Sequence, residues 1–294
     1  MAATIWTELL GAEVKVIQGE QYRSRILEAG REHPETVILT HAGGGHVEAY
    51  ARNVVPLGRH VHVVAIEMLW HGLSEAPPIR EDRIAQESEQ VLDVVDALGV
   101  DRAWIVGHGS GGVVLTWLAL NHPERLNGLV YQTTIGGMKL NTPGPAAPPP
   151  GPGGRSFAEL TLDTLANPTL DAVRARLLPA VHPRHPERIT DEMVAIRQAH
   201  YRNPTTNEGM ARYYRHHAAY STTEEQMAGV QVPVLALAND SRGDASIAPA
   251  RRLAEVAPTG QLKVVPDTGN WIHWEAPDEF NEAIRQFVAG EPVS

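Results

Sequence analysis

The residues with the clearest chemical meaning form the stretch IVGHGSGG, from Ile105 to Gly112. Its glycines fit the dinucleotide-binding pattern G-x-G-x-x-G, in which a tight turn lets a pyrophosphate approach the backbone. The stretch also fits the nucleophile elbow G-x-S-x-G, a sharp strand-to-helix turn, with Gly109 where a serine would stand. The first pattern would bind a cofactor, and the second would hold a hydrolytic site without its reactive atom.

The dinucleotide pattern is the less favoured of the two. It normally follows the first strand of its unit, whereas at least three strand-like segments precede Ile105 here. It also needs an acidic residue about 20 residues further on, at the end of the next strand, to hold the ribose. The segment Leu129–Thr133 offers none. We therefore expect no bound cofactor.

The elbow pattern accounts for more of the stretch. A turn this sharp needs small residues two positions before and after its apex, and Gly107 and Gly111 stand at these positions around Gly109. Centring the turn on Ser110 would put His108 at a crowded position, so Ser110 is a poor substitute nucleophile. The sequence thus predicts an elbow with glycine at its apex.

Strands and helices alternate on both sides of this elbow. This alternation is typical of an α/β fold with a mostly parallel sheet covered by helices on both faces. The first two strands are short and adjacent, which predicts an antiparallel hairpin. Strands are expected at 13–17, 21–28, 36–39, 62–66, 103–106, 126–132, 233–238 and 261–265, and helices from about 46 to 55 and at 84–98, 111–120, 248–256 and 278–289.

The alternation is interrupted after Thr133. Residues 141–154 read NTPGPAAPPPGPGG, which is too rich in proline and glycine for regular structure. Helical segments are then expected at 157–165, 169–177, 190–200 and 206–220. We predict one α/β core formed by residues 1–133 and 227–294, with a helical cap, or lid, inserted at 134–226.

Three segments in the first half of the chain resemble the α/β-hydrolase superfamily, in the branch of small lid-bearing esterases and carbon–carbon hydrolases. HAGGG, which begins at His41, resembles the His-Gly loop that supplies an oxyanion-hole amide. AIEMLWHGLSEAP resembles D-x-x-G-x-G-x-S, with Glu67 at the acidic position and Trp70 in place of a glycine. VGHGSGG resembles VGHSMGG. The resemblance covers nearly the whole predicted core and implies the α/β-hydrolase fold.

Two further segments resemble those that carry the rest of the family's catalytic triad. In LANDSRGDASIAP the triad acid is best matched by Asp244, with Asp240 as second choice. In VVPDTGNWIHWEAPDEF the histidine position is occupied by Asn270. The resemblance therefore implies that Gly109 replaces the nucleophile and Asn270 the base. Acyl-enzyme chemistry needs both an attacking atom and a base, and neither glycine nor an amide can supply them.

Asp244 is then the one triad residue expected to remain. Opposite Asn270 it would be a partly buried carboxylate without a cation. Burial raises the pKa of a carboxyl group, so Asp244 could act as a general acid or base. An inert hydrogen bond between Asp244 and Asn270 is the alternative.

Other candidate residues belong to the same predicted sheet edge, where small molecules bind in such folds. The resemblance implies that amides at Ala42 and Ser110, beside Gly43, polarise a carbonyl.

His273 lies three positions beyond Asn270, heading into a helix, and is expected to point elsewhere. His60 and His62 alternate on a strand, but two ligands do not make a metal site, and we expect no metal ion. The remaining candidate contacts are His41, His46, His108 and Trp271, with His108 and Trp271 equally compatible with packing, and Glu48 in the first turn of a helix.

The composition limits the partners and the compartment. The chain has 294 residues, a net charge of −10 and no cysteine. The charge argues against nucleic acid or an anionic membrane as partner, and the lack of cysteine excludes disulfides and thiolate sites. No stretch approaches the roughly 18 apolar residues of a membrane span, and no signal peptide is visible. We expect a cytoplasmic protein with a small-molecule ligand, in an oligomeric state that the sequence leaves open.

Three functions are compatible with these residues. The first is an enzyme without a serine nucleophile: a lyase, a cyclase, an isomerase, or a hydrolase that acts through a bound water. The second is a catalytically silent binding protein. The third is a serine hydrolase inactivated by substitution at positions 109 and 270. We favour the first, acting on a largely apolar small molecule with a carbonyl group, because the loops, the acid and the lid are all expected to be intact.

Overall fold

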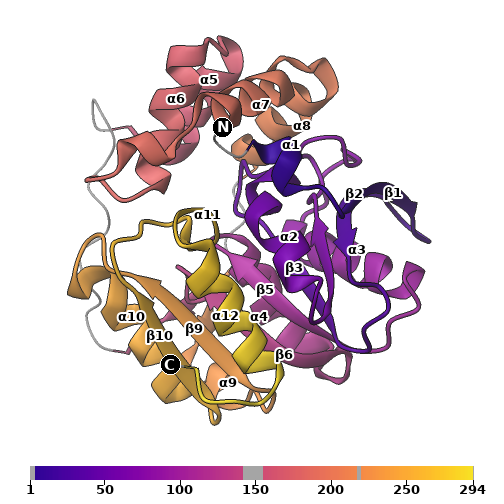
Figure 1. Cartoon of the computed structure of the whole chain (residues 1–294), viewed down its shortest axis with the longest axis vertical. Coiled ribbons are helices and arrows are strands. Elements are labelled where there is room, and N and C mark those ends of the chain that lie inside the picture. The colour runs from indigo at the N-terminus through magenta and orange to yellow at the C-terminus, as the bar shows by residue number, and fades with distance from the viewer. Residues whose placement is uncertain (1–3, 142–154, 217–219, 294) are drawn as a thin grey trace.

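The computed structural model describes residues 4–141, 155–216 and 220–293. Eight strands form one sheet in the order β1-β2-β4-β3-β5-β6-β9-β10 (Figure 1). The predicted hairpin and the mostly parallel sheet are confirmed, since β2 is antiparallel to β1 and β4 and the other neighbours are parallel. The strands are β1 (Glu13–Gln18), β2 (Arg23–Ala29), β3 (Thr36–Thr40), β4 (His62–Ile66), β5 (Ala103–His108), β6 (Leu126–Gln132), β9 (Val234–Asn239) and β10 (Gly260–Val265).

Helices cover both faces of the sheet, and each face has its own apolar core. Successive residues of a strand point to opposite faces, so Ile38 of β3 packs into one core and Leu39 into the other. Helices α3 (Arg83–Ala97), α4 (Gly111–Asn121), α9 (Glu224–Ala228) and α10 (Asp244–Val256) contribute to the first core, and α2 (Ala51–Leu57) and α12 (Pro277–Val288) to the second.

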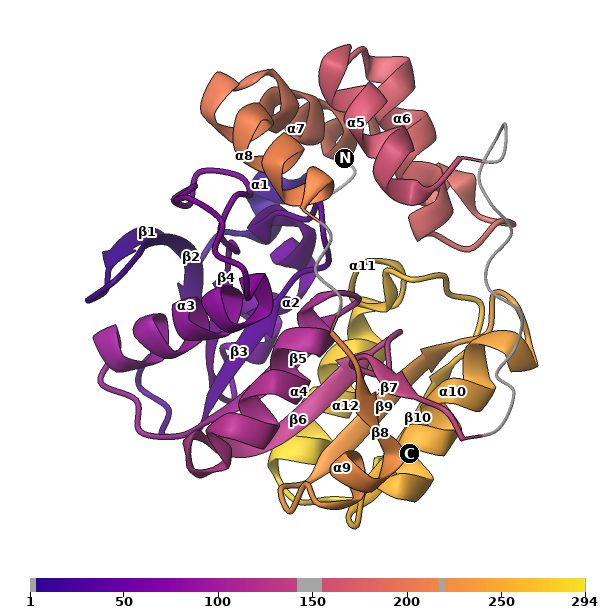
Figure 2. The same ribbon diagram turned by 180° about the vertical axis from the view of Figure 1, so that it is seen from behind.

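A layer of four helices lies above the sheet, at the ends of its strands (Figures 1 and 2). These are α5 (Phe157–Ala166), α6 (Leu170–Leu177), α7 (Asp191–Arg202) and α8 (Pro204–Arg215), which we call the α5–α8 layer. Their buried residues form a third apolar cluster together with Trp271 and Trp274 of the sheet-bearing part. The layer therefore packs on the loops that follow the strands.

Some predicted boundaries were wrong. Helix α8 begins at Pro204, because the Asn203 side chain accepts hydrogen bonds from the backbone at its start, and it ends at Arg215 instead of residue 220. Helix α10 begins at Asp244, before the expected residue 248. The segment predicted to be irregular falls, from residue 142 to 154, outside the described residues.

Several short elements were not predicted, because a few residues carry too little periodicity to be recognised. They are α1 (Ile5–Glu8), α11 (Ile272–Glu275), the paired strands β7 (Met138–Lys139) and β8 (Thr222–Thr223), and 3-10 turns at Pro123–Arg125, Leu178–Ala180 and Pro186–Arg188. The helix expected from about 46 to 55 is a 3-10 turn at Val47–Tyr50 followed by α2. Among the described residues, no helix has both the length and the apolar character needed to cross a membrane.

Candidate active site

The strand-to-helix turn at the elbow has the tight geometry that its glycines require. Gly109 connects β5 to α4 with a φ of 55°, a conformation that favours glycine. A Cβ atom at Gly107 would lie 2.7 Å from the backbone of Gly111, and one at Gly111 would lie 2.6 Å from Thr40 Oγ1. Both flanking positions are therefore restricted to glycine by close backbone packing.

The space beside the apex is occupied by Ala42. A Cβ atom at Gly109 would lie 2.8 Å from Ala42 Cβ, which is closer than real Cβ contacts come. Ala42 belongs to the HAGGG loop after β3, so its methyl group is fixed to the backbone of a neighbouring strand's loop. A nucleophile side chain at position 109 would require this loop to move.

Ser110 connects the elbow to the α5–α8 layer. The Gly43 amide donates a hydrogen bond to Ser110 Oγ at 2.7 Å. The Tyr213 hydroxyl, from α8, donates to the same oxygen at 3.4 Å. The Arg83 guanidinium lies 4.0 Å from the centre of the Tyr213 ring. The Gly43 amide is thus already engaged by Ser110, and the expected roles of the Ala42 and Ser110 amides toward a carbonyl remain predictions.

Asn270 faces another amide. Its side chain is exposed, and its Oδ1 accepts a hydrogen bond from Asn239 Nδ2 at 3.4 Å. Its backbone carbonyl accepts from Gln132 Nε2 at 3.1 Å and from Thr133 Oγ1 at 3.3 Å. Asn239 is the last residue of β9, so an amide stands where the sequence suggested a carboxylate.

The expected position of Asp244 was wrong. Its side chain is 79% exposed and lies 3.4 Å from Arg251 Nη1. Gly243 adopts a φ of 55° and turns the chain, so that Asp244 becomes the first residue of α10 and faces solvent. The second choice, Asp240, has a buried Oδ1 without a hydrogen-bond partner. No catalytic acid of the predicted kind is therefore paired with Asn270 in the described structure.

Two candidate histidines near the elbow are buried and neutral. The His108 and His273 rings lie 5.1 Å apart, and His273 Nδ1 accepts a hydrogen bond of 2.7 Å from Gln132 Nε2. Burial lowers the pKa of His108 to about 3 and holds the pKa of His273 well below its usual value. Both rings are therefore uncharged at neutral pH and pack beneath the site.

His41 and Trp271 are also held by internal contacts. His41 Nδ1 donates to the Ala42 carbonyl at 2.9 Å, and the Met68 amide donates to His41 Nε2 at 3.1 Å. Burial lowers the pKa of His41 to about 4. Trp271 packs into the third apolar cluster, and its amide donates to the Ala180 carbonyl at 3.0 Å. Both nitrogens of His41 are therefore used within the fold.

Trp70 occupies the position where the resembling motif has a glycine. Its φ is 67°, a conformation that is unusual for a bulky side chain. The indole Nε1 donates to the Pro77 carbonyl at 2.7 Å, and the ring packs near Tyr213. Glu67, at the acidic position of the same motif, is buried and lies 3.2 Å from Arg25 Nη1. The packing of Trp70 against Tyr213 of the α5–α8 layer therefore stabilises the strained backbone turn at Trp70.

Arg197 was not predicted as a site residue. It lies on α7, is 4% exposed, and has Nε and Nη2 atoms without hydrogen-bond partners. Its Nη1 donates to the Tyr201 hydroxyl at 3.4 Å, and no carboxylate of the described residues pairs with it. A Cβ atom at Gly44 would lie 3.5 Å from Nη1 and 2.7 Å from the Tyr214 hydroxyl, which also has no partner. The guanidinium therefore lies against the HAGGG loop.

The sequence did contain a signal for Arg197. The buried residues of α7 are Met193, Val194, Arg197 and Tyr201, which share one helical face. A basic residue on the apolar stripe of a predicted helix is expected to be buried, and buried charged residues are usually paired. No acidic residue lies on the same face of this helix.

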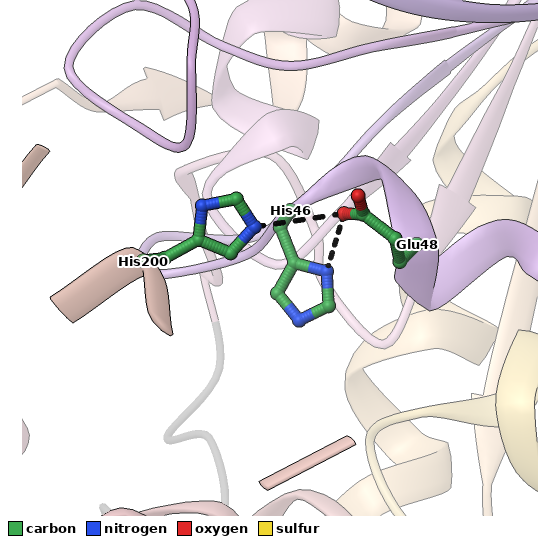
Figure 3. A group of neighbouring side chains, drawn as sticks. All are labelled: His46, Glu48 and His200. Carbon is green, nitrogen blue, oxygen red and sulfur yellow. Dashed lines mark hydrogen bonds and ion pairs between the residues drawn. The ribbon is translucent and has the colours of Figure 1, made fainter. Parts of the chain in front are cut away.

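The candidate residues His46 and Glu48 lie together with His200, which was not predicted as a site residue (Figure 3). Glu48 Oε2 lies 3.1 Å from His46 Nδ1 and 3.7 Å from His200 Nε2, and Glu48 Oε1 lies 2.6 Å from Arg25 Nη2. Burial alone would raise the pKa of Glu48, but hydrogen bonds from the two histidines and Arg25 hold it below its usual value. Burial lowers the pKa of His46 to about 3.

Comparison with known proteins agrees with this architecture. The family model described as the alpha/beta hydrolase family matches residues 37–283. The chain belongs to this family.

Individual relatives within the family cover most of the chain. The 2-hydroxy-6-oxo-6-phenylhexa-2,4-dienoate hydrolase of Burkholderia cepacia is 28% identical over 91% of this chain and 92% of its own length. The 2-hydroxy-6-oxononadienedioate/2-hydroxy-6-oxononatrienedioate hydrolase of Comamonas testosteroni has the same identity and coverage. The crystal structure of the serine hydrolase CCSP0084 from Cycloclasticus zankles superimposes with a TM-score of 0.79 at 20% identity, covering 95% of this chain and 99% of that one. The names of all three describe hydrolases.

Proposed function

We propose that the chain is an enzyme that binds a largely apolar small molecule carrying a carbonyl and a carboxylate group, and that transforms it without a serine nucleophile. The observation that carries this proposal is the buried guanidinium of Arg197 beside the HAGGG loop, which lies near the Tyr201 and Trp271 rings but has no carboxylate partner among the described residues. The helical segment 134–226 serves as a cap in this proposal, because α7 and α8 contribute Arg197, Tyr213 and Tyr214 to the same place.

A buried charge without a counterion is costly. The Nε and Nη2 atoms of Arg197 are free to donate, and this pair of atoms matches the two oxygens of a carboxylate. The hydroxyl of Tyr214 is a further buried polar atom without a partner, next to Gly44. The names of the two curated relatives describe unsaturated carboxylates that also carry an oxo group, a dienoate in one and dioates in the other. An anionic substrate would therefore satisfy the atoms that the protein leaves unpaired.

The region around the elbow supports a reaction without acyl-enzyme formation. Gly109 has no side-chain atom to attack with, and Ala42 occupies the adjacent space. Neither Asn270 nor Asn239 can accept a proton near neutral pH. The Ser110 hydroxyl accepts hydrogen bonds from the Gly43 amide and the Tyr213 hydroxyl and keeps its own proton to donate. Such a donor suits polarisation of a carbonyl, as in a lyase, cyclase, isomerase or water-mediated hydrolase.

Ligand-dependent stabilisation tests the substrate class. Phenylalkanoates and their carboxamides differ at one group, and only the carboxylates should raise the unfolding temperature through Arg197. Arg197→Met keeps most of the side-chain volume and should weaken carboxylate binding by about 2 kcal/mol or more, or about 30-fold in Kd. Arg202→Met, at an exposed position of the same helix, is the matched control. Equal stabilisation by carboxylate and carboxamide, or unchanged binding by Arg197→Met, would contradict the proposal.

Turnover separates an enzyme from a silent binding protein. The protein is incubated with 2-hydroxy-6-oxo-6-phenylhexa-2,4-dienoate, the compound in a relative's name, and with a panel of other apolar oxo-carboxylates, and the products are identified by mass spectrometry. Conversion without a covalent intermediate supports the proposal. Recovery of every bound compound unchanged leaves the silent binding protein as the better description. An acyl adduct on the protein refutes the non-serine mechanism.

A further inference from the structure

His46, Glu48 and His200 come from two parts of the fold and meet at one point (Figure 3). His46 ends the HAGGG loop, Glu48 follows it in the 3-10 turn Val47–Tyr50, and His200 lies near the end of α7. One ligand atom from each side chain lies within 4.8 Å of the other two. Two imidazole nitrogens and one carboxylate oxygen therefore converge where the α5–α8 layer packs on the sheet.

We propose that His46, Glu48 and His200 bind one divalent transition-metal ion, with Zn²⁺ as the simplest candidate. This replaces the expectation from sequence that the chain binds no metal. It does not rest on the proposed function, because metal binding can be measured without any substrate.

The spacing of the donor atoms fits such an ion. Zinc binds histidine nitrogen and carboxylate oxygen at about 2.0–2.2 Å, which separates neighbouring ligand atoms by about 2.8–3.6 Å. The distance of 3.1 Å from Glu48 Oε2 to His46 Nδ1 lies within this range, whereas the 3.7 Å to His200 Nε2 is slightly longer, so His200 would have to move toward a bound ion by a few tenths of an ångström. Two histidines and one carboxylate also leave coordination positions open for water or a ligand. Mg²⁺ and Ca²⁺ fit less well, since they favour oxygen ligands throughout.

The surroundings hold the carboxylate in position for this role. Arg25 donates to Glu48 Oε1 at 2.6 Å, which directs Oε2 toward the histidines. Arg25 also lies 3.2 Å from Glu67 Oε1, a fully buried carboxylate. His46 would bind through Nδ1, and its Nε2 is buried without a hydrogen-bond partner among the described residues, so this ring lacks the outer contact that usually holds a ligating histidine. Outer contacts therefore orient the ligand oxygen, as they do in protein metal sites.

The local charge permits a cation. Arg197 is positive and acts electrostatically on His46, so it opposes metal binding. Arg25 pairs with both Glu48 and Glu67, at 2.6 and 3.2 Å, so these three side chains together carry one negative charge when both acids are ionised. A divalent ion would then be accompanied by an anionic ligand at an open coordination position.

A second group in the structure provides an internal comparison. His182, His185 and Asp267 also place their ligand atoms within 4.8 Å of one another. Asp267, however, is 44% exposed and already pairs with Arg184 and Arg188, at 2.8 and 3.1 Å. Two arginines on the same carboxylate make this group the poorer cation site.

The test is Zn²⁺ binding to chelator-treated protein, followed by calorimetry and by metal analysis after gel filtration. The parent should bind one equivalent. His200→Gln should lower the affinity by at least the roughly 10–100-fold that is lost even when an outer contact of a metal site is removed. His185→Gln, in the comparison group, should bind like the parent. The Arg197→Met protein should also retain zinc, which separates this proposal from that of the carboxylate site.

The same experiment includes controls for the folding of the variants and for the location of the bound metal ion. His200 is 12% exposed at its side chain, and circular dichroism and urea unfolding should show that His200→Gln remains folded. Co²⁺ should produce visible absorption bands in the parent and in His185→Gln, but not in His200→Gln or His46→Gln. The proposal is overturned if the parent binds no Zn²⁺ below about 1 mM, if folded His200→Gln binds it equally well, or if only His185→Gln loses it.

Discussion

Gly109→Ser is the substitution whose cost can be worked out most directly from the structure. The φ of 55° at this position costs an L-amino acid about 1–2 kcal/mol. The new Cβ would lie 2.8 Å from Ala42 Cβ, whereas apolar carbon atoms pack at about 3.5–4.0 Å. Because Ala42 Cβ is attached to the backbone, relief requires movement of the loop, and such overpacking costs about 1–3 kcal/mol. We expect a loss of about 2–5 kcal/mol in the free energy of unfolding.

Gly243→Ser separates the two contributions. Gly243 has the same φ of 55° with a ψ of −135°, a strained backbone that costs a non-glycine residue about 1–3 kcal/mol, and a Cβ there would meet nothing within 4 Å among the described residues. It should therefore lose only the conformational part, and Gly109→Ser should be the less stable of the two by about 1–3 kcal/mol. Ala42→Gly combined with Gly109→Ser should recover this difference. Urea unfolding of the parent, the two single variants at 42 and 109, and the double variant completes the cycle.

Two outcomes would refute this reasoning. One is equal destabilisation by Gly109→Ser and Gly243→Ser, which would mean that the contact with Ala42 carries no cost. The other is a double variant whose loss is the simple sum of its parts, which would mean that positions 42 and 109 are not coupled. The same geometry predicts that Gly109→Ser with Asn270→His does not create an esterase unless Ala42→Gly and Asn239→Asp are added, because Asn239 is the residue that faces position 270.

Three further outcomes are expected. Asp244→Asn should change the free energy of unfolding by less than about 1 kcal/mol, because the ion pair with Arg251 is exposed. It should also leave turnover unchanged, and a large loss of turnover would restore Asp244 as a site residue. His108→Asn should reduce the dependence of the free energy of unfolding on pH in the acid range. Burial lowers the pKa of His108 in the folded protein to about 3 from 6.5, so the unfolded chain binds more protons between these pH values. The free energy of unfolding of the parent should therefore fall as the pH drops from 6.5 toward 3, by up to about 1.4 kcal/mol per pH unit. Urea titrations at several pH values measure this slope, with the exposed His122→Gln as control; an unchanged slope in His108→Asn would contradict it. A fluorophosphonate probe should not label the elbow, and an adduct on Ser110 found by mass spectrometry would show that the apex was assigned wrongly.

Much of the fold could be predicted because it depends on local patterns. The buried strands β3 and β4 are continuous apolar runs, as expected for strands covered on both faces. Helix α3 follows from its spacing of apolar residues and its Asp82 cap. The site was only partly predictable. The elbow is local, so Gly109 could be placed. Asp244 could not, because the positive φ at Gly243 turns it toward solvent, and Asn239 at the end of β9 faces Asn270 instead.

The sequence by itself determined the order of strands and helices along the chain and the glycine at position 109 of the elbow. These properties follow from residue type and short-range spacing. Only the tertiary structure decided that Ala42 closes the space beside Gly109 and that Arg197 is buried without a carboxylate partner in the described part of the chain. It also brought His200 of α7 to His46 and Glu48. These contacts join segments far apart in the chain, and their geometry depends on how the α5–α8 layer packs on the sheet, which no local pattern encodes.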